Sequence, residues 1–151
     1  MPIDEDFFSK GALKGPDDSL GFVLWRATHA WQRFLEHALL PTGLTHLRFA
    51  MLIALGWLTR EEVTITQRQL ADFMNVHPMQ VSQVLAALEH ANLVMRHPSS
   101  SDRRALALTL TPAGEAVLRQ AMPIVEEAHR EFFAKPEVRS AAFRKALLML
   151  T

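Results

Sequence analysis

One short stretch of the chain carries side chains of the kinds that read the edges of DNA bases. Met79, Gln80, Ser82 and Gln83 follow closely on Pro78. A glutamine amide can bridge N6 and N7 of adenine, a serine hydroxyl can pair with several base edges, and apolar groups meet the thymine methyl. These residue types therefore indicate contact with the major groove of DNA. The alternative for the same stretch is an ordinary solvated helix surface.

A second polar stretch stands further along the chain, where Asp102, Arg103 and Arg104 follow three serines. A long cation on a projecting tip suits the narrow minor groove, whose negative potential attracts arginine. A neighbouring carboxylate can fix the direction of a guanidinium through paired hydrogen bonds. The alternative is a solubilising turn, since serine and aspartate are common turn residues.

The first polar stretch lies on a helix predicted over residues 78–91, with Pro78 at its first position and His77 as an unusual N-terminal cap. At 100° per residue, four apolar residues fall within about 100° of arc and form a core face. These residues are Val81, Val84, Leu85 and Leu88. The opposite face carries no lysine or arginine, although surface helices normally carry several charges there. Such a face suits a DNA groove, and a solvated helix of a plain bundle is an equal alternative on this helix alone.

Two long helices are predicted ahead of this region. The first covers residues 19–40, where apolar residues recur at helical spacing until Pro41 stops the helix. The second covers residues 45–58, with Thr45 as its cap. Because this second helix is apolar on almost every side, we expect it to be buried at the centre of the core.

Short elements surround the two polar stretches. Residues 63–65 predict one strand, and Thr66 with Gln69 forms a capping box that opens a short helix. Residues 93–95 and 105–110 predict the two strands of a hairpin whose tip carries the arginines. A capped short helix, a break, a second helix and a basic-tipped hairpin in this order are typical of a winged helix-turn-helix.

The remainder of the chain predicts more helix. Thr111 caps a long helix that starts at Pro112, and Pro123 inside it is expected to bend it. Pro136 starts a last helix. The predicted fold class is therefore mainly α with a small β-wing.

Composition excludes several classes of protein. A length of 151 residues fits one domain, and the absence of cysteine excludes disulfide scaffolds, thiolate metal sites and thiol redox sensing. Sixteen basic residues cancel sixteen acidic ones, so total charge does not support nucleic-acid binding. No apolar run reaches the roughly 20 residues of a membrane span, and the acidic start does not match a signal peptide. We therefore expect a cytoplasmic protein.

Two other classes of function compete with DNA binding. A winged-helix module for protein contacts would use the same outer helix face, and the neutral total charge favours it, whereas the tip at residues 102–104 favours DNA. An enzyme is not expected, because no nucleophile beside a base, paired carboxylate motif or phosphate loop is visible.

The residues from Gln69 to Arg96, followed by those from Asp102 to Gly114, resemble the MarR family of bacterial transcriptional regulators. The most specific likeness is Asp-x-Arg followed by Leu-x-Leu-Thr and a glycine near the start of the next helix. Helix order and length agree over nearly the whole chain. The resemblance implies a homodimer that binds a palindromic operator, with two recognition helices about one DNA turn apart.

The resemblance also implies roles for individual residues. Arg104 corresponds to the minor-groove arginine, Asp102 to its orienting partner and Arg103 to a phosphate contact. The stretch that contacts bases and phosphates corresponds to Gln80, Ser82 and Gln83, beside Met79.

Two positions depart from the family. His77 stands where the family often has serine or aspartate, and Gln83 stands where it often has arginine. Losing that cation should lower the attraction to phosphate and the salt dependence of binding. The operator sequence therefore cannot be carried over.

The family architecture implies three parts. Residues 1–18 form a flexible acidic arm, residues 19–43 and 112–151 form a helical dimerisation region, and residues 44–111 form the winged helix-turn-helix DNA-binding domain. Several apolar residues of the dimerisation region could lie between two chains or in the core of each. They are Leu118, Ile124, Val125, Phe132, Phe133, Leu147, Leu148 and Leu150.

Many members of the family are released from DNA by small ligands that bind where the dimer helices meet the winged domain. The resemblance therefore implies a repressor released by a small aromatic or anionic ligand. Candidate pocket residues on the first two helices are Trp25, His29, His46, Arg48 and Trp57. Pairing with a nearby acid, or reaching to solvent, is the alternative for Arg48.

Zinc sensing is another possibility that the family allows. His29, His37, His46 and Glu36 supply suitable ligand atoms, but no two histidines stand at i and i+4. We expect no metal and no cofactor.

Overall fold

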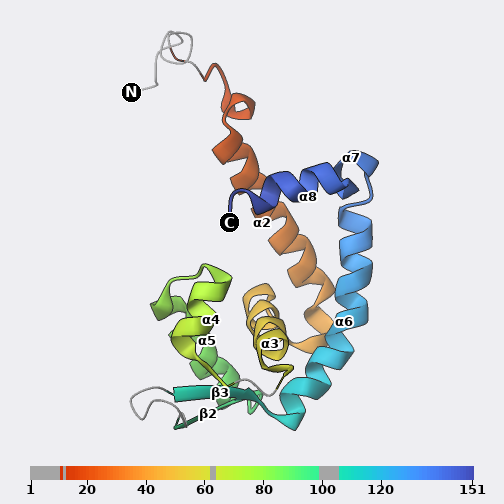
Figure 1. The fold of residues 1–151 in the computed structure, drawn as a ribbon. Coiled ribbons are helices and arrows are strands. Elements are labelled where there is room, and N and C mark those ends of the chain that lie inside the picture. Colours follow the sequence, from red (N-terminus) through yellow and green to blue (C-terminus); the bar gives the residue numbers. More distant parts are fainter. Residues whose placement is uncertain (1–10, 12, 62–63, 99–105) are drawn as a thin grey trace, which may run out of the picture.

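The computed structural model describes residues 11, 13–61, 64–98 and 106–151. It is mostly helical with one small sheet, as the sequence predicts (Figure 1). The elements in chain order are η1 (Pro16–Asp18), α2 (Leu20–Ala38), η2 (Leu40–Thr42), α3 (His46–Thr59), β1 (Ile65–Thr66), α4 (Gln67–Met74), α5 (Pro78–His90), β2 (Val94–Pro98), β3 (Leu106–Leu110), α6 (Pro112–Phe132), α7 (Pro136–Arg139) and α8 (Ala141–Leu148). Within the described residues, no helix has both the length and the apolar character needed to cross a membrane.

Side-chain caps fix the helix starts where the sequence predicts them. Ser19 Oγ and Thr45 Oγ1 accept hydrogen bonds from backbone N–H groups three residues later, at 3.2 and 3.3 Å. The capping box of Thr66 and Gln69 is complete, because each side chain bonds the backbone N–H of the other residue. Thr111 caps α6 in the same way. Such caps satisfy N–H groups that have no partner within the helix.

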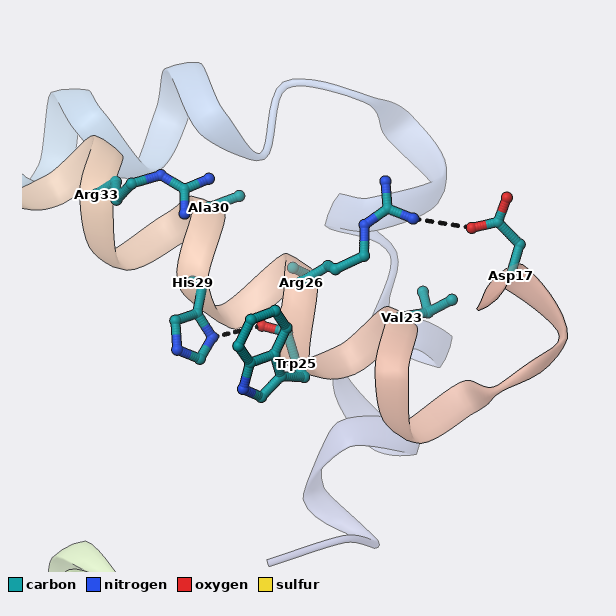
Figure 2. Close-up of a pocket in the computed structure, with 8 residues that line it drawn as sticks. Asp17, Val23, Trp25, Arg26, His29, Ala30 and Arg33 are labelled. Carbon is teal, nitrogen blue, oxygen red and sulfur yellow. Dashed lines mark hydrogen bonds and ion pairs between the residues drawn. The ribbon is translucent and has the colours of Figure 1, made fainter. Parts of the chain in front are cut away.

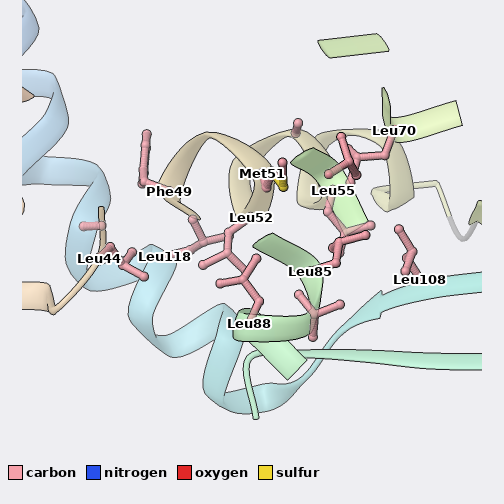
Figure 3. Close-up of a cluster of buried hydrophobic side chains, with 14 of the residues drawn as sticks. Leu44, Phe49, Met51, Leu52, Leu55, Leu70, Leu85, Leu88, Leu108 and Leu118 are labelled. Atoms are coloured by element: carbon pink, nitrogen blue, oxygen red, sulfur yellow. The ribbon is translucent and has the colours of Figure 1, made fainter. Parts of the chain in front are cut away.

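The core lies between α3 and α5 (Figure 3). Met51, Leu52 and Leu55 of α3 are fully buried, as are Leu85 and Leu88 of α5. Burying each of these side chains contributes about 1.5–3 kcal/mol. The expected central position of α3 is therefore confirmed.

The last turn of α3 departs from that expectation. Trp57 is 57% exposed, so the prediction that this helix is buried on almost every side is wrong there. Its ring lies under the guanidinium of Arg60, whose Cζ is 3.8 Å from the ring centroid. The exposed ring thus makes a cation–π contact with Arg60 in place of contacts with the core.

The sheet places β3 between β1 and β2, with antiparallel pairing on both sides. Its strand boundaries differ from the predicted ones. The first strand is Ile65–Thr66 rather than residues 63–65, and residue 63 lies outside the described residues. β2 runs on to Pro98, because it pairs with β3 along its whole length up to Pro98 opposite Leu106.

The last helix predicted from Pro136 is two helices. α7 ends at Arg139, and Ser140 adopts an extended conformation before α8 begins. Ser140 Oγ accepts a hydrogen bond from the N–H of Phe143 at 3.1 Å, so this serine acts as the cap of a new helix. Pro123, in contrast, lies inside α6, which continues through it and changes direction along its length (Figure 1).

An aromatic cluster joins α2 to the far end of α6. Trp31 lies 5.2 Å from Phe132 and 5.0 Å from Phe133 between ring centroids, and Phe34 lies 5.4 Å from Phe132. Aromatic pairs in this range stabilise beyond the area they bury. Phe132 and Phe133 therefore pack within the chain, as does Leu118, which is buried.

The first half of α2 and all of α8 contrast with this cluster. Residues 20–28 and 141–150 are exposed throughout, although they include many large apolar side chains. Leu20 is 85% exposed and Leu148 is 65% exposed.

Within the arm expected at residues 1–18, the described part contains η1, and Asp17 forms an ion pair with Arg26 at 2.9 Å.

Candidate nucleic-acid interface

The start of α5 is fixed by an uncommon cap. Nδ1 of His77 accepts a hydrogen bond from the N–H of Met79 at 3.2 Å, and Pro78 occupies the first helical position. The preceding helix α4 ends at Asn75, whose φ of 51° is left-handed. Asparagine tolerates this conformation better than most residues. The break between the two helices and the cap at His77 are therefore confirmed as predicted.

The two faces of α5 divide as the helical angles predict. The inner face holds Val81, Leu85 and Leu88, which are fully buried, and Val84, which is half-buried. The outer face consists of exposed residues with small, amide or thioether side chains before its last turn. The exposed residues of α5 are Pro78, Met79, Gln80, Gln83, Ala86, Glu89 and His90. The helix therefore presents a polar but nearly uncharged surface.

Two candidate residues differ in exposure. Met79 is 65% exposed at the first turn of α5, which leaves its thioether free to meet an apolar group. Ser82 is half-buried and lies at the edge of the outer face. The N-terminal turn that carries Met79 also carries the partial positive charge of the helix dipole, which attracts phosphate.

Positive charge comes from the element before α5. Arg68 of α4 has 89% of its side chain exposed and lies 3.8 Å from the carboxylate of Asp72. Sequence reasoning did not single out Arg68. Arg68 lies at the start of a capped helix. The first helix of a helix-turn-helix crosses the DNA backbone, so this position is the sequence signal for a phosphate contact.

The wing consists of β2 and β3, and its tip lies outside the described residues. Asp102, Arg103 and Arg104 belong to that tip, so their roles stay predictions.

The strand leading to the tip carries a cation that sequence reasoning also missed. Arg96 of β2 donates a hydrogen bond from Nη2 to the backbone carbonyl of Ser82 at 3.3 Å. Its Nε lies 3.6 Å from Oε2 of Glu89, so the two side chains form an ion pair. Arg96 thus joins β2 to α5. The contact with Ser82 joins residues fourteen positions apart, so no local pattern in the sequence signals it.

Two of the five candidate ligand residues lie together. Trp25 and His29 have ring centroids 4.1 Å apart, and Nδ1 of His29 lies 2.7 Å from the carbonyl oxygen of Trp25 (Figure 2). They line an open pocket of about 540 Å³ together with Arg26 and Arg33. Sequence reasoning missed these two arginines, although they are seven residues apart and so share a helix face. The pocket therefore combines aromatic rings with cations.

The other three candidates do not line this pocket. His46 is the first residue of α3, and its burial lowers its pKa from the ordinary value of 6.5, while the Glu36 carboxylate partly opposes the change. Arg48 is half-buried and its backbone N–H donates to the cap residue Thr45. Trp57, at the other end of α3, lines a separate pocket with Phe73. Each of the three remains a prediction.

The suggested zinc ligands do not form a recognisable site in the part of the chain that the structure describes. That part contains no group of three or more His, Asp or Glu residues placed to hold a metal ion. His29, for example, is engaged with Trp25. Zinc sensing therefore has no support from the geometry.

Comparison with known proteins identifies the fold and its relatives. The pattern of the MarR family matches residues 49–106, which run from the fourth residue of α3 to the first residue of β3. A relative from Bacillus subtilis (strain 168), the uncharacterized HTH-type transcriptional regulator YdcH, is 38% identical over 122 residues, which cover 81% of this chain and 83% of the relative. The chain belongs to the MarR family.

Solved structures extend the similarity beyond the matched region. The MarR-family chain superposes on CouR from Rhodococcus jostii RHA1 bound to p-coumaroyl-CoA with a TM-score of 0.76 and 27% identity, covering 91% of this chain and 94% of that one. The transcriptional repressor CouR bound to a 23-mer DNA duplex gives a TM-score of 0.71 and 29% identity, covering 89% and 90%. The chain is thus a winged helix-turn-helix transcriptional regulator of the MarR family.

Proposed function

We propose that this protein is a cytoplasmic homodimeric repressor that binds a palindromic operator and is released by a small aromatic or anionic ligand. The outer face of α5 carries the proposal. It exposes Met79, Gln80 and Gln83 while Leu85 and Leu88 anchor the helix in the core. A recognition helix needs both properties, because its base-reading side chains must be free and its backbone held rigidly.

The chemistry of the outer face suits A·T base pairs. Gln80 and Gln83 carry amides that can bridge adenine, while Met79 and Ala86 carry apolar groups suited to the thymine methyl. Phosphate contacts would come from Arg68 and from the predicted wing residues Arg103 and Arg104. The DNA-bound CouR structure supports this mode of binding, because it is a related repressor solved on duplex DNA.

The exposed apolar helices support a homodimer. The first half of α2 and the whole of α8 expose leucines and aromatic rings over a continuous length of each helix. Large exposed apolar surfaces usually mark an interface. A twofold dimer would place two α5 helices on successive turns of the duplex, about 34 Å apart.

The pocket lined by Trp25 and His29 supports an aromatic anionic effector. A planar ligand can stack on the indole, and Arg33 can pair with a carboxylate or phosphate, as can Arg26 once the anion replaces its partner Asp17. CouR, which binds p-coumaroyl-CoA, shows that a related repressor binds an aromatic acyl ligand with anionic groups. p-Coumaroyl-CoA is therefore a suitable first probe.

The proposal is tested by selecting duplexes from a randomised DNA library with the wild-type protein and measuring binding by gel shift. We expect a palindromic, A·T-containing sequence that binds much more tightly than a scrambled duplex. Arg104→Ala should weaken this specific binding markedly and leave the dimer intact. Failure to enrich any sequence would overturn DNA binding, and unchanged affinity of Arg104→Ala would remove the wing tip from the mechanism.

The effector is tested separately with p-coumaroyl-CoA added to the complex of protein and selected duplex. We expect release of DNA, and quenching of tryptophan emission that is lost in Trp25→Phe. Release that persists unchanged in both Trp25→Phe and Arg26→Gln would place the effector site elsewhere.

A protein-binding module is the second candidate function. Trp57, Phe73 and Met79 are exposed large apolar residues on the winged domain, and the chain has no net charge. A protein partner would use such residues and would not need a duplex. Selection of no duplex at low salt, together with a stable dimer, would favour this candidate over the first.

A further inference from the structure

Arg96 occupies an unusual position between the recognition helix and the wing. Its side chain is only 19% exposed, although it stands on a short strand of a small sheet. Nη2 donates to the carbonyl oxygen of Ser82, and Nε lies 3.6 Å from the carboxylate of Glu89. Ser82 and Glu89 are about two helical turns apart. A single guanidinium therefore contacts α5 at two positions that are about two helical turns apart.

The same residue is fixed on its other side by the sheet. Arg96 stands opposite Leu108 in the ladder between β2 and β3, only two residues before the end of β2. A change in the angle between α5 and the wing would have to break the contact with Ser82, the contact with Glu89 or the ladder. Arg96 thus constrains the relative position of the two elements that are proposed to contact DNA.

The bridge is costly to the folded protein. Nε of Arg96 is inaccessible to solvent and has no hydrogen-bond partner among the described residues. A buried donor without a hydrogen bond costs about 1–3 kcal/mol, a cost that an apolar side chain of similar volume does not carry. A planar guanidinium, however, can hold two acceptors in a fixed geometry, which neither lysine nor an apolar residue can do. Arginine at this position is therefore better suited to holding α5 in place than to stabilising the fold.

We infer that Arg96 is a positioning residue, which holds α5 at the angle to the wing that specific DNA binding requires, through Ser82 and Glu89. This inference rests on the proposed function. A direct phosphate contact is the main rival, because Arg96 lies close to the tip of the wing. The rival needs an accessible guanidinium, whereas this side chain is only 19% exposed, its Nη2 donates to Ser82 and its Nε lies 3.6 Å from the Glu89 carboxylate.

The test uses the duplex that the wild-type protein selects and a scrambled duplex of the same composition, at a temperature where circular dichroism shows every variant folded. Arg96→Gln should lose about tenfold in affinity for the selected duplex and little for the scrambled one. Arg96→Lys, which keeps the charge but can hold only one partner, should fall between Arg96→Gln and the wild type. Arg119→Gln removes the same charge from the exposed surface of α6 and is the matched control.

A second arm examines the partner of Arg96. Glu89→Gln should lower the ratio of specific to scrambled affinity in the same direction. Combined with Arg96→Gln, it should add less than the sum of the two single effects, because both variants break one bridge. Strict additivity would mean that the two residues act independently and would contradict the inference.

Salt dependence separates the inference from its rival. A positioning residue leaves the slope of affinity against salt unchanged, whereas loss of a phosphate contact lowers it by about one and weakens both duplexes equally. That second pattern, or an unchanged ratio in Arg96→Gln, would overturn the inference while leaving the proposed function standing. If the wild-type protein selects no duplex, the proposed function fails first, and the positioning role fails with it.

Discussion

The winged domain and the dimerisation helices use apolar residues in opposite ways. In the winged domain, the apolar faces of α3 and α5 meet within one chain and are fully buried. Along the first half of α2 and along α8, side chains of the same kinds are exposed. The second half of α2 and much of α6, in contrast, are packed internally, through buried residues such as Leu35 and Leu118 and through the cluster around Trp31. The apolar faces of α3 and α5 are thus buried within one chain, while α8 and the first half of α2 keep theirs exposed.

This difference shows that an apolar helical pattern does not by itself say what the helix packs against. α3 and α8 both carry many apolar residues, but only those of α3 include fully buried ones, whereas every residue of α8 is exposed. Substitutions of one type in both regions can therefore separate folding from assembly.

Glycine substitutions should give the largest contrast. A Cβ on Gly114 would stand 2.0 Å from the backbone carbonyl oxygen of Leu93, where α6 packs on the start of β2. Gly114→Ala should therefore cost on the order of 4 kcal/mol or more in the free energy of unfolding, measured by urea denaturation. Gly21→Ala, at the second position of α2, is the control, since beyond its chain neighbours and its own helix backbone no described atom lies within 4 Å of the added Cβ, and it should change stability by less than about 0.5 kcal/mol. Equal effects of the two would contradict the contrast.

Replacing a leucine with alanine should give the second-largest difference between the two regions. Leu88→Ala removes a fully buried side chain and should cost about 2–5 kcal/mol of stability. Leu148→Ala should change the unfolding of the winged domain by less than about 0.5 kcal/mol, because the residue is exposed in the chain. It should instead raise the dimer dissociation constant about tenfold, measured by sedimentation equilibrium. A dimer unaffected by Leu148→Ala would exclude this part of α8 from the interface.

Within the winged domain, α5 itself offers a finer comparison between its inner and outer faces. Gln83→Ala should leave stability within about 0.5 kcal/mol of the wild type but cost about 1–3 kcal/mol of binding to the selected duplex. Gln120→Ala, on the exposed surface of α6, is the matched control and should leave binding unchanged. An equal loss on all sequences would identify Gln83 as a phosphate contact rather than a base contact.

The smallest expected effect concerns His46, at the start of α3. Because burial lowers its pKa below the unfolded value of 6.5, the unfolded chain binds its proton more readily than the folded chain does. Stability should therefore fall as the pH falls below about 6.5, and His46→Gln should reduce this dependence. Urea denaturation at several pH values measures it, with the exposed His37→Gln as control. Identical pH profiles of wild type and His46→Gln would show that this histidine does not titrate differently on folding.

Local sequence signals predicted the fold well because they act over one helical turn. Thr45, Thr66 and Thr111 each cap a helix through a hydrogen bond to a residue three positions away, and that spacing is visible in the sequence. Ser140 uses the same interaction. It was missed because the apolar pattern continues on both sides of it, which favoured one uninterrupted helix.

The candidate site was less predictable because its contacts join distant residues. The outer face of α5 follows from helical angles alone, and it is where the sequence predicts it. The bridge from Arg96 to Ser82 spans fourteen residues and two elements, so neither residue type nor spacing indicates it. The five ligand candidates were grouped because they share two helices, yet only Trp25 and His29 share a pocket.

The chain contains three tryptophans and no tyrosine, so its intrinsic emission comes from tryptophan alone. Trp25 lies in the open pocket, Trp31 in the cluster between α2 and α6, and Trp57 on the winged domain against Arg60. Replacing two of them at a time with phenylalanine would give three optical reporters in one scaffold. Effector binding, opening of the helical joint and movement of the DNA-reading half can then be timed separately in the same stopped-flow experiment.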